Sequence, residues 1–244
     1  GHGYDEDKLN KALEALDCMT KDIVEPQNAY VDFSDGVKII PEVEGNQIDF
    51  KKLSEAVGNA IKAGEVRLDI DAADCYTKPE VTVDSEDFKK KTEPIKKLTK
   101  ATITLNIGPE KEVIDSSVSE RFLKQTEDGT IEIDKDKVKK YMEAMEEKYE
   151  TYGKPHDFKT TGGNVVSLSG SLGFSIAAET ETEKIIEELK AGKDVTREVT
   201  YDATAPTWEG NQIGDTYLEI SLSDQYMWFY KNGKVIVETD VVTG

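Results

Sequence analysis

"VKIIPEVEG", residues 37–45, and "VVSLSGSLG", residues 165–173, are two versions of one pattern, and their relationship decides the fold of the chain. Both stretches are rich in residues that favour strands, and both end in glycine. Each is followed, at the same distance, by an Ala-Gly pair, residues 63–64 and 191–192, with room for a helix between. Amphipathic helices resemble one another in any protein, but shared glycines at equal distances indicate a duplicated unit.

The helices upstream of the two stretches also match. "DEDKLNKALEAL" (5–16) aligns with "DKDKVKKYMEAM" (134–145), and both carry apolar residues at helical spacing. Asp5 and Asp134 are the predicted N-caps. The two apolar stripes are Leu9, Leu13 and Leu16, and Val138, Met142 and Met145.

Each unit is therefore predicted to contain a helix, a hairpin, a second helix and a strand. The first unit has its hairpin at 28–34 and 37–43, turning at 34–36, and its final strand at 65–72. The second has its hairpin at 156–160 and 164–168, turning at 161–163, and its final strand at 193–203. Gly64 and Gly192 are expected to end the second helices, and Thr180 with Glu183 is expected to form a capping box.

A connector, residues 79–133, joins the two units. Ser85 is expected to begin a helix that Pro94 kinks or restarts. A strand is predicted over 101–108, and a short helix over 115–125 with Asp115 or Ser116 as its cap. Residues 202–214 are predicted to be a turn-rich linker after the second unit.

The chain closes with a predicted β-hairpin. Residues 226–231 and 234–242 are rich in aromatic and β-branched residues and flank Asn232-Gly233, which suits a type I′ turn. The run Tyr226–Tyr230 has no alternating polar residue, so it indicates a strand covered on both faces. Residues 215–242 are expected to pair with another chain, pack on the second unit, or be poorly ordered.

Composition limits the classes of function. A formal net charge of −19 argues against binding to nucleic acid or to an anionic membrane. Two cysteines and two histidines are too few for a disulfide scaffold or an ordinary zinc site. No apolar run is long enough to span a membrane. The opening Gly1-His2-Gly3 is typical of a cloning remnant, so we expect any export signal or membrane anchor to lie outside this sequence.

The chain resembles, along nearly its whole length, the N-terminal part of a Gram-positive L,D-transpeptidase, where tandem modules named for peptidoglycan binding precede a catalytic domain. The first module matches through "PQNAYVDF" (26–33), "IIPEVEGNQID" (39–49), "AIKAGEVRLDI" (60–70) and "YTKPEVT" (76–82). The second matches through residues 148–176 and "REVTYDATAP" (197–206). The ending, residues 213–244, resembles the first strands of the catalytic domain and closes in V-V-T-G.

This resemblance implies an α+β chain of two related modules in tandem, followed by an isolated β-hairpin. The implied domains are a first module at 1–95, a second at 96–213 and the start of a catalytic domain at 214–244. The implied function is a non-catalytic, extracellular accessory region in the cell wall that binds peptidoglycan or positions the catalytic domain. The alternative is a spacer or protein-interaction module of a cell-surface protein with no affinity for glycan.

The family's catalytic cysteine lies in a S-H-G-C stretch, which this sequence lacks, so no catalytic residue is assigned. No cofactor or metal site is assigned either, and the residues that would contact peptidoglycan are not specified. Contact with a membrane is expected only through a segment outside this sequence. Self-association through the hairpin within 215–242 is a further expectation.

Several residues could suggest chemistry, but each has a simpler interpretation. Cys18 lies opposite the apolar stripe of its helix and lacks a neighbouring base, and a disulfide between Cys18 and Cys75 stays open. His156 is interpreted as a partly exposed structural residue. Asp69, Asp71 and Asp74 could form a calcium loop or a solvated strand end. A group of six lysines could bind anionic wall polymer or form a solvated helix face: Lys89, Lys90, Lys91, Lys96, Lys97 and Lys100. Tyr201 and Trp208 could stack on sugar rings or serve as packing residues.

Overall fold

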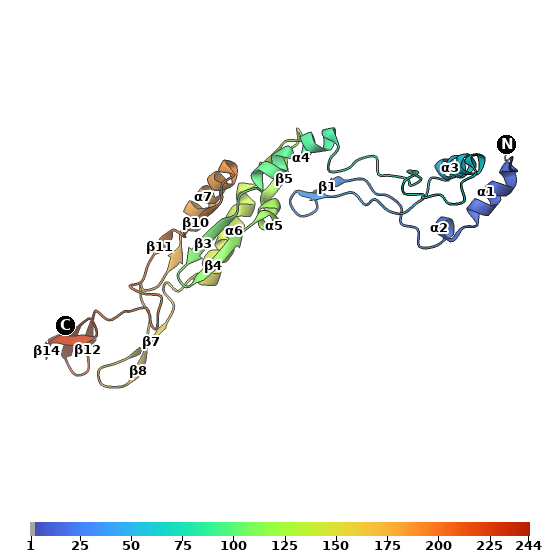
Figure 1. Ribbon diagram of the computed structural model, residues 1–244. Coiled ribbons are helices and arrows are strands. Elements are labelled where there is room, and N and C mark those ends of the chain that lie inside the picture. Colours follow the sequence, from blue (N-terminus) through green and yellow to red (C-terminus); the bar gives the residue numbers. More distant parts are fainter. Residues whose placement is uncertain (1–2) are drawn as a thin grey trace. The chain divides into compact units, whose positions relative to one another are not determined.

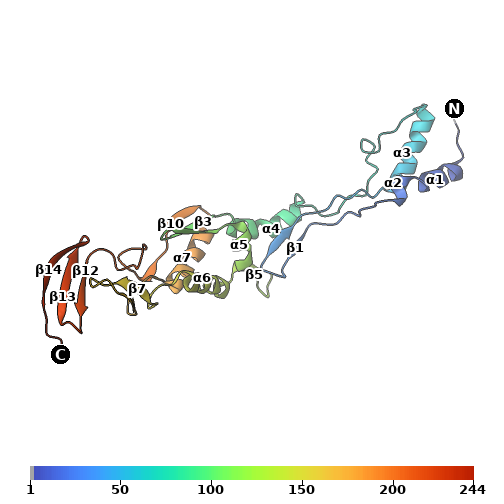
Figure 2. The same ribbon diagram turned by 90° about the horizontal axis from the view of Figure 1, so that it is seen from below.

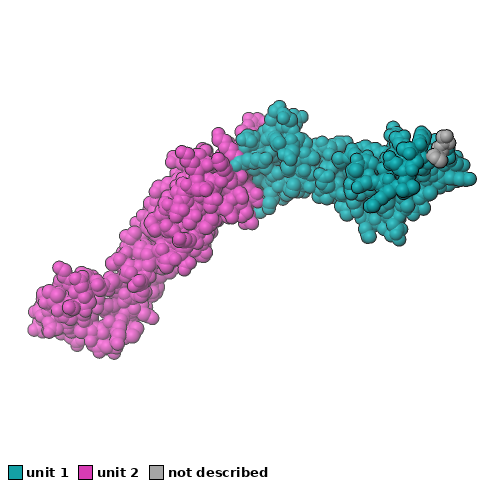
Figure 3. All heavy atoms as spheres, in the orientation of Figure 1, with its two compact units in different colours: residues 1–96 teal, residues 97–244 magenta. Residues whose placement is uncertain are grey.

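The structure is a computed structural model that describes residues 3–244. Gly1 and His2, which belong to the expected cloning remnant, lie outside the described residues. The chain divides into two compact units, residues 1–96 and 97–244, which Figure 3 shows in different colours. Each unit has its own hydrophobic core, and each is described here by itself.

The first unit is built from helices and one short hairpin (Figure 1). Its elements are α1 (Glu6–Glu14), α2 (Asp17–Thr20), β1 (Tyr30–Asp32), β2 (Lys38–Ile40), α3 (Phe50–Ala63) and α4 (Glu86–Leu98), whose last residues pass the boundary at Lys96. Asp5 caps α1 as predicted, accepting a hydrogen bond from the Lys8 N–H. Leu13 of α1 and Leu53 of α3 pack with Ile48 and Cys75 in the core.

The prediction of a strand over residues 65–72 is wrong. After α3 ends at Gly64 in the left-handed conformation, Val66 is fully exposed and the chain turns. The Asp69 carboxylate accepts hydrogen bonds from the backbone N–H groups of Asp71 and Ala72, and the turn continues to Cys75. The segment has the composition of a strand, but no described neighbouring strand is present to pair with it.

The second unit contains a three-stranded sheet covered by two helices (Figure 2). Its first elements are β3 (Ile103–Ile107), β4 (Glu110–Ile114), α5 (Ser116–Ser119), a 3-10 turn η1 (Glu120–Phe122), β5 (Leu123–Gln125), β6 (Ile131–Ile133) and α6 (Lys135–Tyr149). The remaining elements are β7 (His156–Lys159), β8 (Val165–Leu168), β9 (Ser175–Ile176), α7 (Ala178–Ala191), β10 (Val195–Glu198), β11 (Tyr201–Ala203), β12 (Tyr217–Ser221), β13 (Tyr226–Lys231) and β14 (Lys234–Asp240).

The sheet order explains why this unit has a strand that the first unit lacks. β3 is the central strand, pairing antiparallel with β4 and parallel with β10. Its buried residues Ile103, Leu105 and Ile107 meet Met142 of α6 and Ile185 of α7 in one core. The strand predicted within the connector is therefore confirmed, and it supplies the partner that β10 needs.

The duplicated pattern is visible in matching backbone contacts. The hairpin β1–β2 has its counterpart in β7–β8, and the antiparallel bridge Ile48–Tyr76 has its counterpart in Ile176–Tyr201. Gly64 and Gly192 end α3 and α7 in the same left-handed conformation, each donating its N–H to two helix carbonyls. The sequence prediction of two related α+β units is confirmed at these positions.

One glycine in each unit allows two segments to cross in close contact. A Cβ atom on Gly45 would lie 2.4 Å from the Val24 carbonyl oxygen, and a Cβ atom on Gly173 would lie 2.3 Å from the Thr151 carbonyl carbon. Both glycines have positive φ, +71° and +127°. Only glycine fits this crossing, so the residue that ends each quoted stretch is a requirement of the fold.

The structure tests three local predictions about the helices. The prediction of a capping box at Thr180 and Glu183 is wrong, because α7 begins earlier, at the buried Ala178. The N-cap residue is Ala177, which makes no side-chain hydrogen bond. α4 runs through Pro94 as one helix, so Pro94 does not restart it. Asp115 caps α5 as predicted, accepting from the N–H groups of the next turn.

The chain closes in the predicted hairpin, enlarged by one strand. β12, β13 and β14 form a separate antiparallel sheet, and Figure 2 shows them side by side. Asn232 and Gly233 both have positive φ, as the predicted turn requires. The aromatic residues of β13 are half-buried, whereas β14 is exposed along its whole length. The sheet contacts the β7–β8 hairpin of the same unit, as expected in one of the three outcomes predicted for this segment.

Candidate functional site

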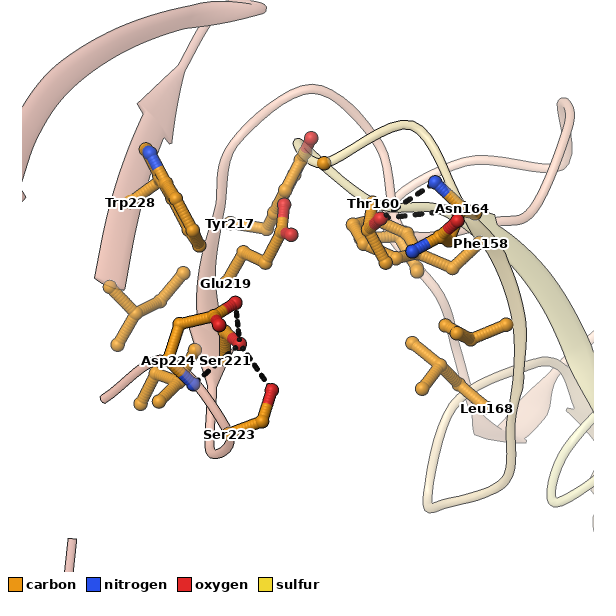
Figure 4. A pocket seen from close by; sticks show the side chains of 15 residues that line it. Phe158, Thr160, Asn164, Leu168, Tyr217, Glu219, Ser221, Ser223, Asp224 and Trp228 are labelled. Atoms are coloured by element: carbon orange, nitrogen blue, oxygen red, sulfur yellow. Dashed lines mark hydrogen bonds between the residues drawn. The ribbon is translucent and has the colours of Figure 1, made fainter. Parts of the chain in front are cut away.

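A groove of about 460 Å³ lies between the β7–β8 hairpin and strand β12 of the second unit (Figure 4). Ligand sites in proteins commonly have volumes of roughly 300–1,000 Å³, so the groove is large enough for a small ligand. The residues that line it are Phe158, Thr160, Gly162, Asn164, Val166, Leu168, Ile213, Tyr217, Leu218, Glu219, Ile220, Ser221, Ser223, Asp224 and Trp228.

One wall of the groove is a single face of the β7–β8 hairpin. The hairpin residues that line the groove are all even-numbered, from Phe158 to Leu168. Side chains alternate between the two faces of a strand, and the register pairs Phe158 with Val166 on the same face. Val165 therefore points away from the groove, and its exposed fraction is 66%. The alternation gives a groove face and an opposite face that can be tested separately.

The other wall is the edge of β12. Five consecutive residues, Tyr217–Ser221, line the groove, which is possible only if the groove runs along the strand and not against one of its faces. β12 is an outer strand of its sheet, paired with β13 on one side. Leu218 and Ile220 are 54% and 43% exposed, so this wall presents aliphatic surface to the groove.

A cluster of polar contacts fixes the two walls relative to each other. The Glu219 carboxylate accepts hydrogen bonds from the backbone N–H and the hydroxyl of Thr161, at 2.9 and 2.6 Å. The Thr161 hydroxyl also lies 2.8 Å from the Tyr230 hydroxyl. Beside this cluster, Phe158 meets the Tyr217 ring edge to face, and Tyr217 stacks on Tyr230. We call the Thr161–Glu219–Tyr230 contact the clasp.

The electrostatics of the groove are acidic. Glu219 and Asp224 are its only charged lining residues, and neither forms an ion pair with any residue in the part of the chain described. Asp224 accepts a hydrogen bond from the Ser221 hydroxyl at 2.7 Å. Burial, with the neighbouring Tyr230 and Glu219, raises the pKa of Tyr217, so its hydroxyl stays neutral at physiological pH. The groove therefore favours neutral or cationic ligands.

The cysteines and His156 lie in separate environments. Cys18 is exposed and Cys75 is fully buried, and both are free thiols, so the disulfide that the sequence left open is not present. Burial raises the pKa of the Cys75 thiol, which disfavours the reactive thiolate. His156 is half-buried at the start of β7, as expected for a structural residue.

The remaining candidates also have structural roles. Asp69 and Asp71 belong to the turn after α3, and Asp74 pairs with Lys52 and Lys78. Among residues 3–244, no three acidic, histidine or cysteine side chains are grouped to hold a metal ion. The six lysines from Lys89 to Lys100 are exposed on and just after α4.

Tyr201 and Trp208 form a packed cluster in the second unit. Trp208 stacks on Phe174 with ring centroids 3.8 Å apart, and Tyr201 meets Phe174 edge to face at 5.5 Å. A Cβ atom on Gly108 would lie 2.5 Å from the Trp208 ring, so the backbone closes one side of it. These contacts cover the aromatic faces, which supports the packing interpretation over sugar stacking.

The sequence interpretation missed a buried ion network that holds β10 against α7. Glu181 is fully buried, and its carboxylate lies 2.8 Å from Arg197 and accepts the Thr200 N–H at 2.8 Å. Arg197 also donates two hydrogen bonds to Glu188. The signal lay in the repeat: Glu181 holds the position in α7 that Leu53 holds in α3, three residues after each helix begins.

None of the helices in residues 3–244 is long and apolar enough to cross a lipid bilayer. This finding concerns the described helices alone.

Comparison with known proteins identifies the family of the chain. No curated protein matches the sequence. Two solved structures are similar at 31% identity: an Ldtfm carbamoyl enzyme with avibactam, and a cysteine-to-serine mutant of the Enterococcus faecium L,D-transpeptidase. The matches cover 64% of this chain and 61% and 62% of those chains, with TM-scores of 0.46 and 0.45. The chain thus spans about three fifths of the length of these relatives.

The family match covers most of both units, including the β7–β8 wall of the groove. It extends over two stretches, residues 2–69 and 81–197, and the family is described as "Putative peptidoglycan binding domain". The two stretches correspond to the two halves of the duplication seen in the sequence and in the backbone contacts. The chain therefore belongs to the peptidoglycan-binding-domain family described by that name.

Proposed function

We propose that this chain is a non-catalytic accessory region of a cell-wall L,D-transpeptidase, in which the groove beside β12 contributes to binding peptidoglycan. In this proposal residues 1–95 and 96–213 are the two accessory modules, and residues 214–244 begin the catalytic domain. The protein would act outside the cell, in the wall of a Gram-positive bacterium, and would neither bind nucleic acid nor carry a cofactor.

The observation that carries the proposal is the position of the groove. One wall comes from the hairpin of a peptidoglycan-binding-family module, and the other from the separate sheet that follows it. Aliphatic side chains, amide and hydroxyl groups and uncompensated carboxylates line it together. Peptidoglycan has the matching chemistry, since its peptide stems carry small apolar side chains and amines, and its sugars carry hydroxyl groups.

Sedimentation with purified sacculi tests this proposal. The wild-type chain should pellet with sacculi at low salt and stay in solution without them. If it stays in the supernatant with sacculi present, the chain does not bind peptidoglycan, and the spacer interpretation replaces the proposal.

Two neighbouring substitutions separate the groove from the rest of the surface. Val166→Glu places a charge on the groove face of β8, and Val165→Glu places the same charge on the opposite face. Both side chains are exposed, so both variants should fold. Val166→Glu should lower the bound fraction at least threefold while Val165→Glu leaves it unchanged. Equal effects would exclude the groove as the contact.

The non-catalytic part of the proposal has its own test. Incubation with a carbapenem, followed by mass spectrometry of the intact chain, should show no covalent adduct. A stoichiometric mass increase would mean that Cys18 or Cys75 reacts as a catalytic nucleophile, and the accessory interpretation would be wrong.

A further inference from the structure

The β7–β8 hairpin extends from the second unit to the closing sheet β12–β14 (Figure 1). We call residues 153–172, which contain this hairpin, the arm. Among the four residues of β7 and the four of β8, Phe158 alone is buried, and none of the eight belongs to the hydrophobic core of the unit. The Phe158 ring instead meets the ring of Tyr217 in β12, with centroids 5.4 Å apart. The buried surface of the two strands is therefore a contact with the closing sheet.

The tip of the arm binds the first strand of that sheet. The clasp joins Thr161, in the turn of the hairpin, to Glu219 in β12. The backbone N–H and the hydroxyl of Thr161 both donate to the Glu219 carboxylate, at 2.9 and 2.6 Å. Hydrogen bonds to an ionised acceptor are stronger than those between neutral groups, so two of them make a firm attachment.

The base of the arm binds the segment just before β12. The Thr151 hydroxyl donates to the side-chain oxygen of Gln212 at 2.9 Å, and it accepts the Phe174 N–H at 2.8 Å. Gln212 is 6% exposed, and a buried polar group is costly to leave unpaired. This contact therefore fixes the linker beside the arm. The chain that enters β12 is held at two points, once before the strand and once within it.

The first unit repeats this arrangement with other residues. After its matching bridge, Ile48–Tyr76, the chain passes along the β1–β2 hairpin as residues 79–83. The Asn28 side chain accepts two backbone N–H groups of this segment, at 2.8 and 3.0 Å. Glu42 accepts a third, at 2.8 Å. In both units the hairpin thus holds the segment that leaves the module, and this recurrence favours a role in the architecture over an incidental contact.

We propose that the arm is a docking surface for the domain that begins with β12, and that it sets the position of that domain relative to the second module. The inference rests on the proposed function, in which residues 214–244 begin the catalytic domain. The base contact is separate from the groove, because Thr151 and Gln212 do not line it. With one attachment made, the other becomes intramolecular and is favoured by a high effective concentration. Losing one contact should leave the sheet docked, and losing both should release it.

Spin labels measure this docking in the whole chain. In a Cys18→Ser background, Glu187→Cys places one label on α7 of the module, and Thr239→Cys places the other on β14. Both positions are exposed, whereas Cys75 is fully buried and protected from the label. Double electron–electron resonance should give one narrow distribution of label distances. A broad distribution would mean that the sheet moves freely, and the proposal would be wrong.

Two substitutions remove the contacts one at a time. Glu219→Ala removes the acceptor at the tip. Gln212→Asn shortens the amide at the base and keeps a residue type that tolerates the positive φ found there. Each variant alone should keep most of the narrow distribution, whereas the double variant should broaden it about twofold or more. The control Val165→Ser, on the opposite face of the arm, should change nothing. A double variant as narrow as the wild type, or a control as broad as the double variant, would overturn the proposal.

A label pair within the module separates release of the sheet from unfolding. Lys140→Cys on α6, combined with Glu187→Cys on α7, should give the same distribution in the double variant as in the wild-type arm. If this internal pair broadens too, the contacts stabilise the module itself and do not dock a separate domain. Sedimentation with sacculi tests the proposed function independently, and Gln212→Asn should leave it unchanged. A chain that fails to sediment but keeps a narrow distribution refutes peptidoglycan binding and supports docking.

Discussion

Replacing Arg197 with methionine tests the buried ion network of the second unit. Among residues 3–244, Arg197 is the only cation within 3.5 Å of the Glu181 carboxylate, and it also holds Glu188 through two hydrogen bonds. The variant Arg197→Met keeps an unbranched, flexible apolar stem and removes the charged guanidinium group. It leaves the Glu181 carboxylate buried without its main partner.

The size of the effect follows from burial. Removing one partner of a buried ion pair typically costs about 3–5 kcal/mol, because the other charge stays out of water. Glu181 is fully buried, but Arg197 and Glu188 are each 19% exposed, so water screens part of the network. We expect the free energy of unfolding of this unit to fall by about 3 kcal/mol, which lowers its melting temperature by roughly 6–12 °C.

The first unit supplies the compensating change. Leu53 occupies the position of Glu181 in the corresponding helix and is 2% exposed. The double variant Glu181→Leu/Arg197→Met should therefore recover about 2 kcal/mol relative to Arg197→Met, since an apolar pair replaces an unpaired charge. The Thr200 N–H loses its acceptor, but Thr200 is half-buried and water can reach it.

Urea unfolding followed by tryptophan fluorescence measures these changes. The chain has two tryptophans, Trp208 and Trp228, both in the second unit, so the signal reports on that unit alone. Arg67→Met, an exposed arginine in the first unit, is the matched control and should leave the transition unchanged. The reasoning is refuted if Arg197→Met loses less than about 1 kcal/mol, or if the double variant is no more stable than the single one.

Three further predictions concern the backbone, a buried tyrosine and the clasp. Gly173→Ala should destabilise the second unit by about 2–4 kcal/mol in the same unfolding assay, because the new Cβ would collide with Thr151. The control Gly163→Ala, with open space around its Cβ, should cost about 1 kcal/mol. Equal losses of stability in the two variants would exclude steric conflict with Thr151. Burial and the nearby Glu112 raise the pKa of Tyr141 to about 12. The neutral form is thus favoured in the folded state, so Tyr141 contributes stability below its unfolded pKa of about 10, and this is lost as the pH rises towards 12. An absorbance titration should show this late phenol, Tyr141→Phe should remove it, and ionisation near pH 10 would contradict the assignment. Thr161→Val removes the hydroxyl of the clasp, so hydrogen exchange of the backbone amides in β7, β8 and β12 should accelerate. The exposed control Thr196→Val should leave these exchange rates unchanged. If Thr161→Val also leaves them unchanged, the clasp does not hold the groove walls.

Local signals in the sequence predicted the local parts of the fold. Asp5, Asp115 and Asp134 cap helices as expected, because a cap depends on the next few residues only. Gly64 and Asn232-Gly233 were predictable for the same reason, since each needs a backbone conformation that few residues adopt. The order of elements in the two units followed from these signals.

Features that depend on distant partners were less predictable. Residues 65–72 have strand composition, but strand β10 in the second unit exists through its pairing with β3, and no equivalent of β3 is described in the first unit. The groove joins hairpin residues to β12, far along the chain, and no local pattern links them. Glu181 resembles an exposed helical acid until the repeat places it at the position of Leu53.

The contrast between the two cysteines makes each half of the molecule separately observable. Cys75 is enclosed in the core of the first unit, while Cys18 is exposed at the surface, where an alkylating reagent can reach it. Once Cys18 is blocked, a reagent in solution can modify Cys75 only when that core opens, so the modification rate records its opening equilibrium. Because the indole signal belongs to the other unit, one intact sample can report whether the duplicated halves melt together or one after the other.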